Sequence, residues 1–337
     1  MWLIIAGSML DAVTGDKQFV SFVCPIISQD DECNSGILHT EWIYSNIGVG
    51  TRCNSCASEN EKDSILEQPH DHIAWLTDTG ERKVTACGRE IEIWELSPHE
   101  DEAILSAWAR YFRQHYIDDD DLPAMVDGTG MNYAEFLRQI KFPDKSNAPG
   151  PSLRSGDFGE ILVADYMEFV LGYWSPRTLR YQDRWNRNDS TKGCDIIGFK
   201  FASDQPHHQN DELFIFESKS GMTKTVHNRL QDAINDSAKD MVREAMTLNA
   251  LKQRMLGRGE MEQAARVQRF QNQAARPFRR INGAAAILDD VVFEETDLAA
   301  SNASAHPNAG QLRLIVIKGP SLMKLVHAIY ERAADEA

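Results

Sequence analysis

Two charged residues at the end of an apolar run have the types and the spacing to act on a phosphodiester bond. Glu217 and Lys219 follow the run 213–216, Leu-Phe-Ile-Phe. Because side chains alternate across a strand, the carboxylate and the ammonium point to one side of it. Burying charge costs several kcal/mol unless it is compensated. The end of this strand therefore predicts a functional site.

Two further carboxylates precede this pair in the sequence. Asp195 opens a second apolar run, and Glu160 lies near the start of a segment that is apolar nearly all round. A hard cation such as Mg²⁺, or Mn²⁺, prefers oxygen ligands, and two carboxylates suffice when water and substrate phosphate fill the other positions. We expect Glu160, Asp195 and Glu217 to be the metal ligands. Lys219 would orient the attacking water and stabilise the developing negative charge.

The order of these residues resembles the core of the PD-(D/E)XK nucleases. A glutamate on a helix, an aspartate on a strand and a Glu-x-Lys on the next strand match that motif over about 157–330, although Cys194 stands where a proline often precedes the aspartate. The resemblance implies an α/β fold with a restriction-endonuclease-like core of order α-β-β-β-α-β. The alternative is a structural cluster of ion pairs, since degenerate members of this fold have lost the site.

Three longer stretches narrow the resemblance. They are Arg154-Ser155-Gly156-Asp157-Phe158-Gly159-Glu160, Trp174-Ser175-Pro176-Arg177 and Lys192-Gly193-Cys194-Asp195-Ile196-Ile197-Gly198-Phe199-Lys200. They look like HamA, the nuclease subunit of Hachiman-type anti-phage systems. That resemblance implies antiviral defence, DNA as the substrate and a superfamily 2 helicase as partner. A catalytically silent subunit that binds DNA or the helicase is the second hypothesis.

The elements that must position these residues follow from hydrophobic periodicity. The back of the chain predicts a helix over about 157–172, three strands, two long helices, a late strand and a final helix. The three strands span 176–182, 194–201 and 212–219. The long helices span about 224–256 and 259–275, the late strand 312–317 and the final helix 321–335.

The front of the chain predicts a separate domain. Residues 1–95 alternate short apolar runs with turn residues, which indicates strands such as 19–23 and 90–94. A helix is expected to begin at Ser97 with Pro98 at its first position, and a short one over about 133–140 behind Asn132. The stretch 143–155, rich in Pro, Ser and Gly, predicts a linker. We therefore expect an acidic, mostly β interaction or regulatory domain over 1–150 and a nuclease domain over 151–337.

Charge is distributed unevenly along the chain. The formal net charge is −16, and residues 1–150 carry 26 acidic against 11 basic residues. Within 241–280, nine basic residues face only three acidic ones. This excess predicts a DNA-binding face that includes Arg276, Arg279 and Arg280, although a solvated helix surface would have the same composition. Repulsion by the acidic front half predicts weak unaided DNA binding and dependence on a partner.

Six cysteines, five of them before residue 90, are too few for a disulfide scaffold and favour a reducing cytoplasm. Cys53 and Cys56 form a Cys-x-x-Cys that could hold a structural Zn²⁺ together with His70, His72 or Cys87. Ordinary buried or reduced cysteines are the alternative. The apolar N-terminus is far shorter than the roughly 20 residues that span a bilayer, so we expect a buried strand and no membrane anchor.

Overall fold

The computed structural model describes residues 2–10, 17–25, 70–176, 179–189, 193–223 and 227–337. The chain divides into two compact units, 1–61 and 62–337. In the first unit, β1 (Trp2–Leu10) and β2 (Lys17–Pro25) pair antiparallel along their whole length. The strands predicted at the N-terminus and at 19–23 are confirmed.

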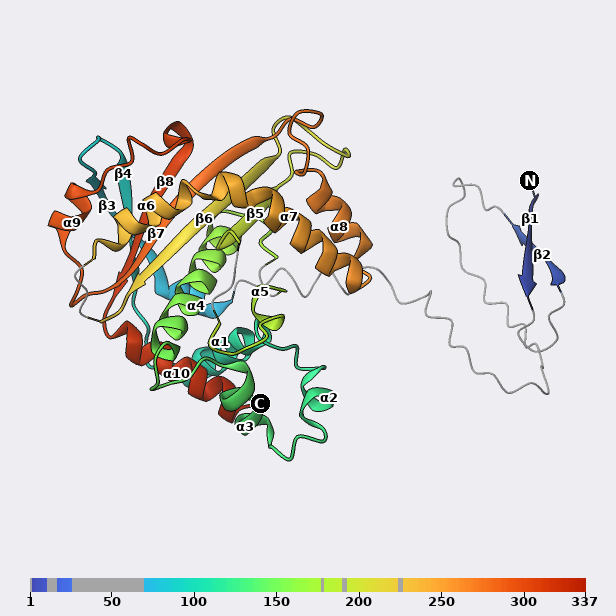
Figure 1. Cartoon of the computed structure of the whole chain (residues 1–337), viewed down its shortest axis with the longest axis horizontal. Helices are drawn as coiled ribbons and strands as arrows, with labels where there is room; N and C mark the ends of the chain where they lie inside the picture. The colour runs from blue at the N-terminus through green and yellow to red at the C-terminus, as the bar shows by residue number, and fades with distance from the viewer. Residues whose placement is uncertain (1, 11–16, 26–69, 177–178, 190–192, 224–226) are drawn as a thin grey trace, which may run out of the picture. The chain divides into compact units, whose positions relative to one another are not determined.

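A six-stranded mixed sheet forms the centre of the second unit (Figure 1). Its strand order is β3 (Leu76–Val84), β4 (Glu90–Leu96), β8 (Leu312–Gly319), β7 (Arg279–Asp289), β6 (Glu212–Gly221) and β5 (Ile196–Lys200). The four inner strands run parallel, and each edge strand is antiparallel to its neighbour. The inner strands are apolar on both faces, as parallel strands covered by helices on both sides must be.

Helices cover the two faces of this sheet (Figure 1). One face packs on α1 (Glu102–Gln114), α4 (Gly150–Asp165) and α10 (Leu322–Asp335). The opposite face packs on α6 (Arg229–Ser237), α7 (Asp240–Gly257), α8 (Met261–Gln268) and α9 (Glu295–Ala300). Strand β6 shows the division, because Phe214 and Phe216 face α4 whereas Leu213 and Ile215 face α7 and α8. The protein is a mixed α/β protein, as the sequence predicts.

Short helical segments join the longer elements. They are a 3-10 turn at Asp71–Trp75, α2 (Leu122–Val126), α3 (Tyr133–Phe136), a π-helical turn at Leu137–Lys141, a second at Tyr166–Val170, α5 (Leu179–Gln182) and a 3-10 turn at Ala309–Gln311. Asn132 caps α3 in a capping box with Glu135, as expected for the predicted short helix. No helix of the described residues is both long and apolar enough to cross a membrane.

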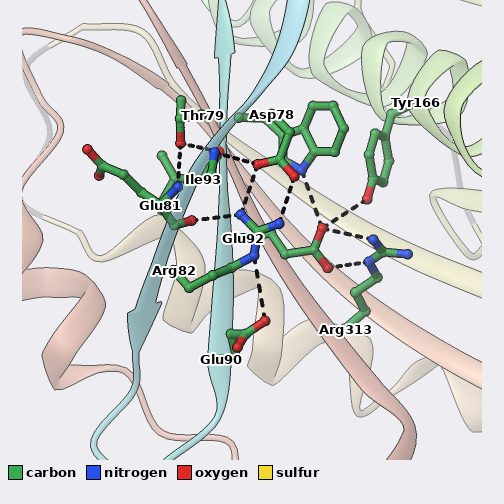
Figure 2. A network of polar contacts seen from close by, with 11 residues as sticks. Asp78, Thr79, Glu81, Arg82, Glu90, Glu92, Ile93, Tyr166 and Arg313 are labelled. Carbon is green, nitrogen blue, oxygen red and sulfur yellow. Dashed lines mark hydrogen bonds and ion pairs between the residues drawn. The ribbon is translucent and has the colours of Figure 1, made fainter.

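The hairpin β3–β4 belongs to the sheet and not to a separate front domain. Strand β4 pairs in parallel with β8, and Arg313 of β8 donates two hydrogen bonds of 2.6 and 2.8 Å to Glu92 of β4. Tyr166, which follows α4, donates a third to the same carboxylate (Figure 2). The boundary between compact units thus lies at residues 61 and 62, whereas the sequence predicted it at 150. The two parts that flank residue 150 share one sheet and one core.

Several predicted elements differ from the observed ones. Helix α1 begins at Glu102, because the side chain of Asp101 accepts the hydrogen bonds of its first turn, and Ser97 is not the cap. Most of the predicted linker 143–155 precedes α4, but its last residues lie inside that helix. The predicted strand 176–182 is replaced by α5 and by an isolated bridge between Trp174 and Phe199.

Strand β7 was missed by the sequence analysis, although it lies between β6 and β8. Its centre reads Asn-Gly-Ala-Ala-Ala over 282–286, and both glycine and alanine are depleted in strands. Gly283 is needed there, because a Cβ at this position would collide with the ring of Phe216 on β6. Small residues let a large aromatic ring fill the layer between sheet and helix.

Candidate active site at the end of strand β6

Asp195 lies beside Glu217 because of strand pairing. In the antiparallel ladder of β5 and β6, Ile196 is opposite Phe216, so the same register continued by one residue puts Asp195 opposite Glu217. Directly opposed residues share a face of the sheet and have Cβ atoms about 5 Å apart. The backbone N–H of Ser218 also donates a 3.4 Å hydrogen bond to Asp195 Oδ2. The structure thus brings these two predicted ligands together.

The turn before β5 holds Asp195 in this place. Gly193 has a φ of +111°, a conformation that L side chains rarely adopt. The next residue, Cys194, donates its backbone N–H to Thr247 Oγ1 of α7 at 3.0 Å. A Cβ at Gly193 would lie 2.9 Å from the same oxygen. Glycine is therefore required for the close approach of this turn to α7.

Glu217 and Lys219 share the face of β6 that is covered by α6 and α7. The Lys219 Nζ lies 2.6 Å from Glu217 Oε1 and 2.8 Å from Asp236 Oδ2 at the end of α6. Burial lowers the pKa of Lys219, but the carboxylates of Glu217 and Asp236 raise it more, so the net shift is upward. The ammonium therefore stays charged at neutral pH.

The carboxyl group of Glu217 is buried without full compensation. It is 2% exposed, and its Oε2 has no hydrogen-bond partner. Burial and the nearby charges of Asp195 and Asp240 raise its pKa to about 9, against the opposing effect of Lys219. An uncompensated buried carboxylate is costly to the fold, and a bound cation would relieve that cost.

Asp240 is a member of this cluster that the sequence analysis missed. It is the first residue of α7, it is fully buried, and neither of its carboxylate oxygens has a hydrogen-bond partner. Burial and then Asp195 raise its pKa to about 7, although Arg243 lies 3.7 Å away. Its signal in the sequence is weak, because a single helix was predicted over 224–256, whereas the structure has a break between α6 and α7 at which Asp236 and Asp240 lie.

Glu160 approaches the site from the other side of β6. It lies on α4, which packs so closely on β6 that a Cβ at Gly159 would collide with Ser220 Oγ. Ser218 and Ser220 point to this face, whereas Glu217 and Lys219 point to the opposite one. The hydroxyl of Tyr181 donates a 2.7 Å hydrogen bond to Glu160 Oε2. Glu160 is therefore held at the end of β6, but on the α4 side.

One cavity of about 1190 Å³ joins the four predicted residues, since Glu160, Asp195, Glu217 and Lys219 all line it. Three further basic residues line it, namely Lys145, Arg229 and Arg243. Its volume suits a polymer segment better than a small ion. Within the described residues, no group of three or more His, Cys, Asp or Glu side chains is arranged to hold a metal ion. The two carboxylates that the strand register places opposite each other are those of Asp195 and Glu217.

The three arginines predicted to bind DNA lie away from this cavity. Arg279 and Arg280 begin β7 and pair with the start of β6, about five residues or roughly 16 Å from Glu217. Arg279 lies 2.7 Å from Glu212, and Arg280 makes two bonds of 2.6 and 2.7 Å with Glu244. Arg276 is exposed. None of the three lines the cavity.

Most of the basic residues in 241–280 have acidic partners within the protein. Six of the nine form ion pairs: Arg243 with Asp240, Arg254 with Asp183, Arg258 with Asp118, Arg269 with Asp211, Arg279 with Glu212 and Arg280 with Glu244. The excess of positive charge along this part of the sequence is therefore largely neutralised in three dimensions.

The predicted zinc ligands divide between described and undescribed residues. Cys53 and Cys56 lie outside the described residues. His72 is buried, stacks on Trp108 and lies 3.1 Å from Asp165. Cys87 accepts a 3.2 Å hydrogen bond from the backbone of Ala303. Both side chains thus have partners within the fold.

Comparison with known proteins places the chain in a family. The model of the family described as HamA matches residues 70–333, which is most of the chain. The chain belongs to the HamA family. HamA proteins are the Hachiman defence proteins, so membership indicates a role in anti-phage defence. The HamA match begins at residue 70, near the start of the unit that contains the sheet and the cavity. No curated protein and no solved structure matched the chain.

Proposed function

We propose that this protein is a metal-dependent DNA nuclease and the effector subunit of a helicase–nuclease defence complex. The observation that carries the proposal is the pair of half-buried Asp195 and buried Glu217, held next to the Lys219 ammonium at the wall of a large cavity. Oxygen donors with surplus negative charge suit Mg²⁺ or Mn²⁺. Membership in the HamA family supports the defence role.

The order of elements supports a PD-(D/E)XK core. Helix α4 is followed by the bridge at Trp174, by β5 and β6, by the helices α6 to α8, and then by β7. This is the order α-β-β-β-α-β, with the first strand reduced to a single bridge against Phe199. Glu160 lies on α4, Asp195 directly precedes β5, and the Glu217–Lys219 pair lies on β6, so the four residues follow one another in the order of the motif.

The chemistry of the site would be divided among its residues. Asp195 and Glu217 would hold a divalent cation, which supplies charge withdrawal from the scissile phosphate and a lower pKa for a bound water. Lys219 keeps its proton and can donate to the attacking water or to a phosphate oxygen. The ion pair with Asp236 fixes the direction of the Lys219 side chain. Glu160 would contact the substrate or its water from the α4 side.

A partner that delivers DNA fits the charge of the molecule. The net charge is −16, and the basic residues of 241–280 are mostly neutralised by internal ion pairs. Free DNA would therefore be held weakly. A superfamily 2 helicase with its own grip on DNA would present the strand at high effective concentration.

The alternative proposal is a catalytically silent subunit on a nuclease fold. Two observations favour it. The described residues contain no group of three side chains arranged to hold a metal ion, and Lys219 is paired with two carboxylates. Such a subunit would bind DNA or the helicase without cutting.

One experiment separates the two proposals. Circular and linear DNA are incubated with the purified chain, alone and with its helicase partner, in Mg²⁺ or in EDTA. We expect Mg²⁺-dependent cleavage that Glu217→Ala abolishes and that Glu212→Gln, at the other end of β6, retains. DNA binding with no cleavage under any condition would support the silent subunit, and cleavage by Glu217→Ala would eliminate the proposed site.

A further inference from the structure

The loop 183–189 leaves an indole ring almost completely in solvent. Trp185 is 98% exposed, and no other large apolar side chain of the described residues is as exposed, the next being Val291 at 81%. Burying a large apolar side chain normally stabilises a fold by a few kcal/mol. The fold gains nothing of this kind from Trp185, so its ring is available to a ligand.

The residues around Trp185 are nevertheless firmly held. Arg184 donates two hydrogen bonds of 2.7 and 2.8 Å to Asp157, and both side chains are buried. Arg187 lies 2.8 Å from Asp144, whose backbone N–H donates to Asn188 Oδ1 at 3.1 Å. A bidentate arginine–carboxylate pair fixes geometry as well as charge. The loop therefore presents the ring at a defined place.

One anchor of this loop lines the cavity, and the other is next to a residue that does. Asp157 lines the cavity itself, and Asp144 directly precedes Lys145, which also lines it. Tyr181, which lies in α5 just before the loop, donates the hydrogen bond to Glu160. Arg184, the residue before Trp185, is thus bonded to a residue that lines the cavity of the proposed active site.

The surroundings of the ring favour a nucleobase over a protein surface. Its neighbours in the loop are all polar or charged: Asp183, Arg184, Asn186, Arg187, Asn188 and Asp189. The core of a protein interface is a contiguous patch depleted in charged residues. A single planar ring among hydrogen-bonding side chains is instead typical of sites where an unstacked base lies on an aromatic side chain.

We propose that Trp185 is a stacking platform for a base of single-stranded DNA that enters the cavity. This deepens the proposed nuclease function and rests on it, because it names the substrate form. In a duplex the faces of internal bases are covered by their neighbours, so only single strands, flaps or frayed ends offer a free face. Lys145 is half exposed, lines the cavity and supplies a positive charge for phosphates that enter it, although Glu331 lies 3.5 Å from its Nζ.

The test measures binding in EDTA, where cleavage does not interfere. Three fluorescent probes are used: a 20-nucleotide single strand, the blunt duplex of the same length, and a single strand with an abasic tract that keeps its phosphates. The variants are Trp185→Ala, Trp185→Tyr, which retains a ring, and Val291→Ala as the control for loss of an exposed apolar side chain. All are made in the full chain.

Trp185→Ala should weaken binding of the single strand about 10-fold. It should leave the duplex and the abasic strand unchanged, while Trp185→Tyr and Val291→Ala bind the single strand as the wild type does. An equal loss on all three probes, or no loss on any, would overturn the proposal. So would loss of helicase binding with normal DNA binding, which would make the ring a protein contact. Absence of cleavage with the binding pattern intact would count against the nuclease and not against the platform.

Discussion

Carboxylates near the start of strand β6 are paired with arginines, whereas carboxylates near its end keep oxygens without a hydrogen-bond partner. At its start, Glu212 is paired with Arg279, and buried Asp211 is held by Arg269 at 2.7 Å. At its end, Glu217 and Asp240 keep carboxylate oxygens without hydrogen bonds. The same strand therefore begins in a saturated network of ion pairs and ends in a surplus of buried carboxylate.

This difference distinguishes carboxylates that stabilise the fold through ion pairs from carboxylates that are available to bind a ligand. A buried carboxylate with a full set of partners is compatible with a stable fold, whereas an unpartnered one destabilises it. Natural folds retain such strain mainly where binding of a ligand relieves it. The cation and phosphate that we propose for the cavity would provide that relief at the end of β6, and nothing of the kind is needed at its start.

The largest difference between the two ends should be in catalysis. Lys219→Ala should lower the rate of DNA cleavage by about 10²-fold or more, because it removes the ammonium next to Glu217. Arg279→Ala, on β7 beside the start of β6, should change the rate less than about 3-fold. Rates are measured on the same labelled DNA with the helicase partner present. Similar losses in both variants would show that cleavage depends on the fold as a whole and not on this end of the strand.

Stability should respond in opposite directions at the two ends. Asp211→Asn should lower the free energy of unfolding by about 3 kcal/mol, because it leaves Arg269 without its buried partner. Glu217→Gln should raise it by about 1–3 kcal/mol at pH 7 without divalent cation, because the wild type must take up a proton at Glu217 on folding and the variant need not. Urea unfolding of the three proteins gives both values. Destabilisation by Glu217→Gln would mean that the carboxylate is structurally satisfied.

The gain from Glu217→Gln should also depend on pH. An unfolded chain loses this proton near pH 4.3, whereas the folded protein holds it to about pH 9. The folded state therefore binds more protons between these values, and the wild type loses stability relative to the variant as pH rises. The two should be equally stable near pH 4 and should differ most above pH 9. Unfolding curves in EDTA across this range provide the measurement, and a pH-independent difference would contradict the shift.

The same end of the strand should respond to metal. Mg²⁺ should raise the melting temperature of the wild type by a few degrees, because it binds the folded state alone. Glu217→Gln and Asp195→Asn should not respond, while Glu212→Gln should respond as the wild type does. Thermal unfolding with and without Mg²⁺ tests this. An equal Mg²⁺ effect in all four proteins would place the cation elsewhere.

The placement of Glu217 and Lys219 on one face of β6 could be predicted from the sequence for a physical reason. Glu217 and Lys219 interrupt an apolar strand, and charged residues in an apolar run can be recognised from the sequence alone. The register that brings Asp195 opposite Glu217 also follows from two adjacent strands. Residues such as Asp236 and Asp240 could not be assigned, because nothing in a long polar helix distinguishes a carboxylate that turns into the sheet from one in solvent.

Predictions that depended on counting charge along the chain were less successful. Arg280 and Glu244 are 36 residues apart, and Arg258 and Asp118 are 140 apart, yet each pair meets in the fold. A local excess of basic residues says little about surface charge until their partners are known. The domain boundary was misplaced for a similar reason, because parallel pairing of β4 with β8 joins segments more than 200 residues apart.

The smallest effect should come from the basic residues at the start of β7, which lie beside the start of β6. Changing Arg276, Arg279 and Arg280 together to Ala should alter single-strand affinity less than about 3-fold and leave its salt dependence unchanged. Two of these arginines are already neutralised by Glu212 and Glu244, so they cannot release counterions from DNA.

Lys145 is the matched residue inside the cavity. Because it lines the cavity and is half exposed, Lys145→Ala should weaken single-strand binding and lower the slope of log affinity against log salt by about 0.7. Binding is measured at several salt concentrations in EDTA. If the triple arginine variant lowered the slope and Lys145→Ala did not, the strand would run along the start of β6. The two ends would then exchange the roles argued here, and the cavity would not be the path of the DNA.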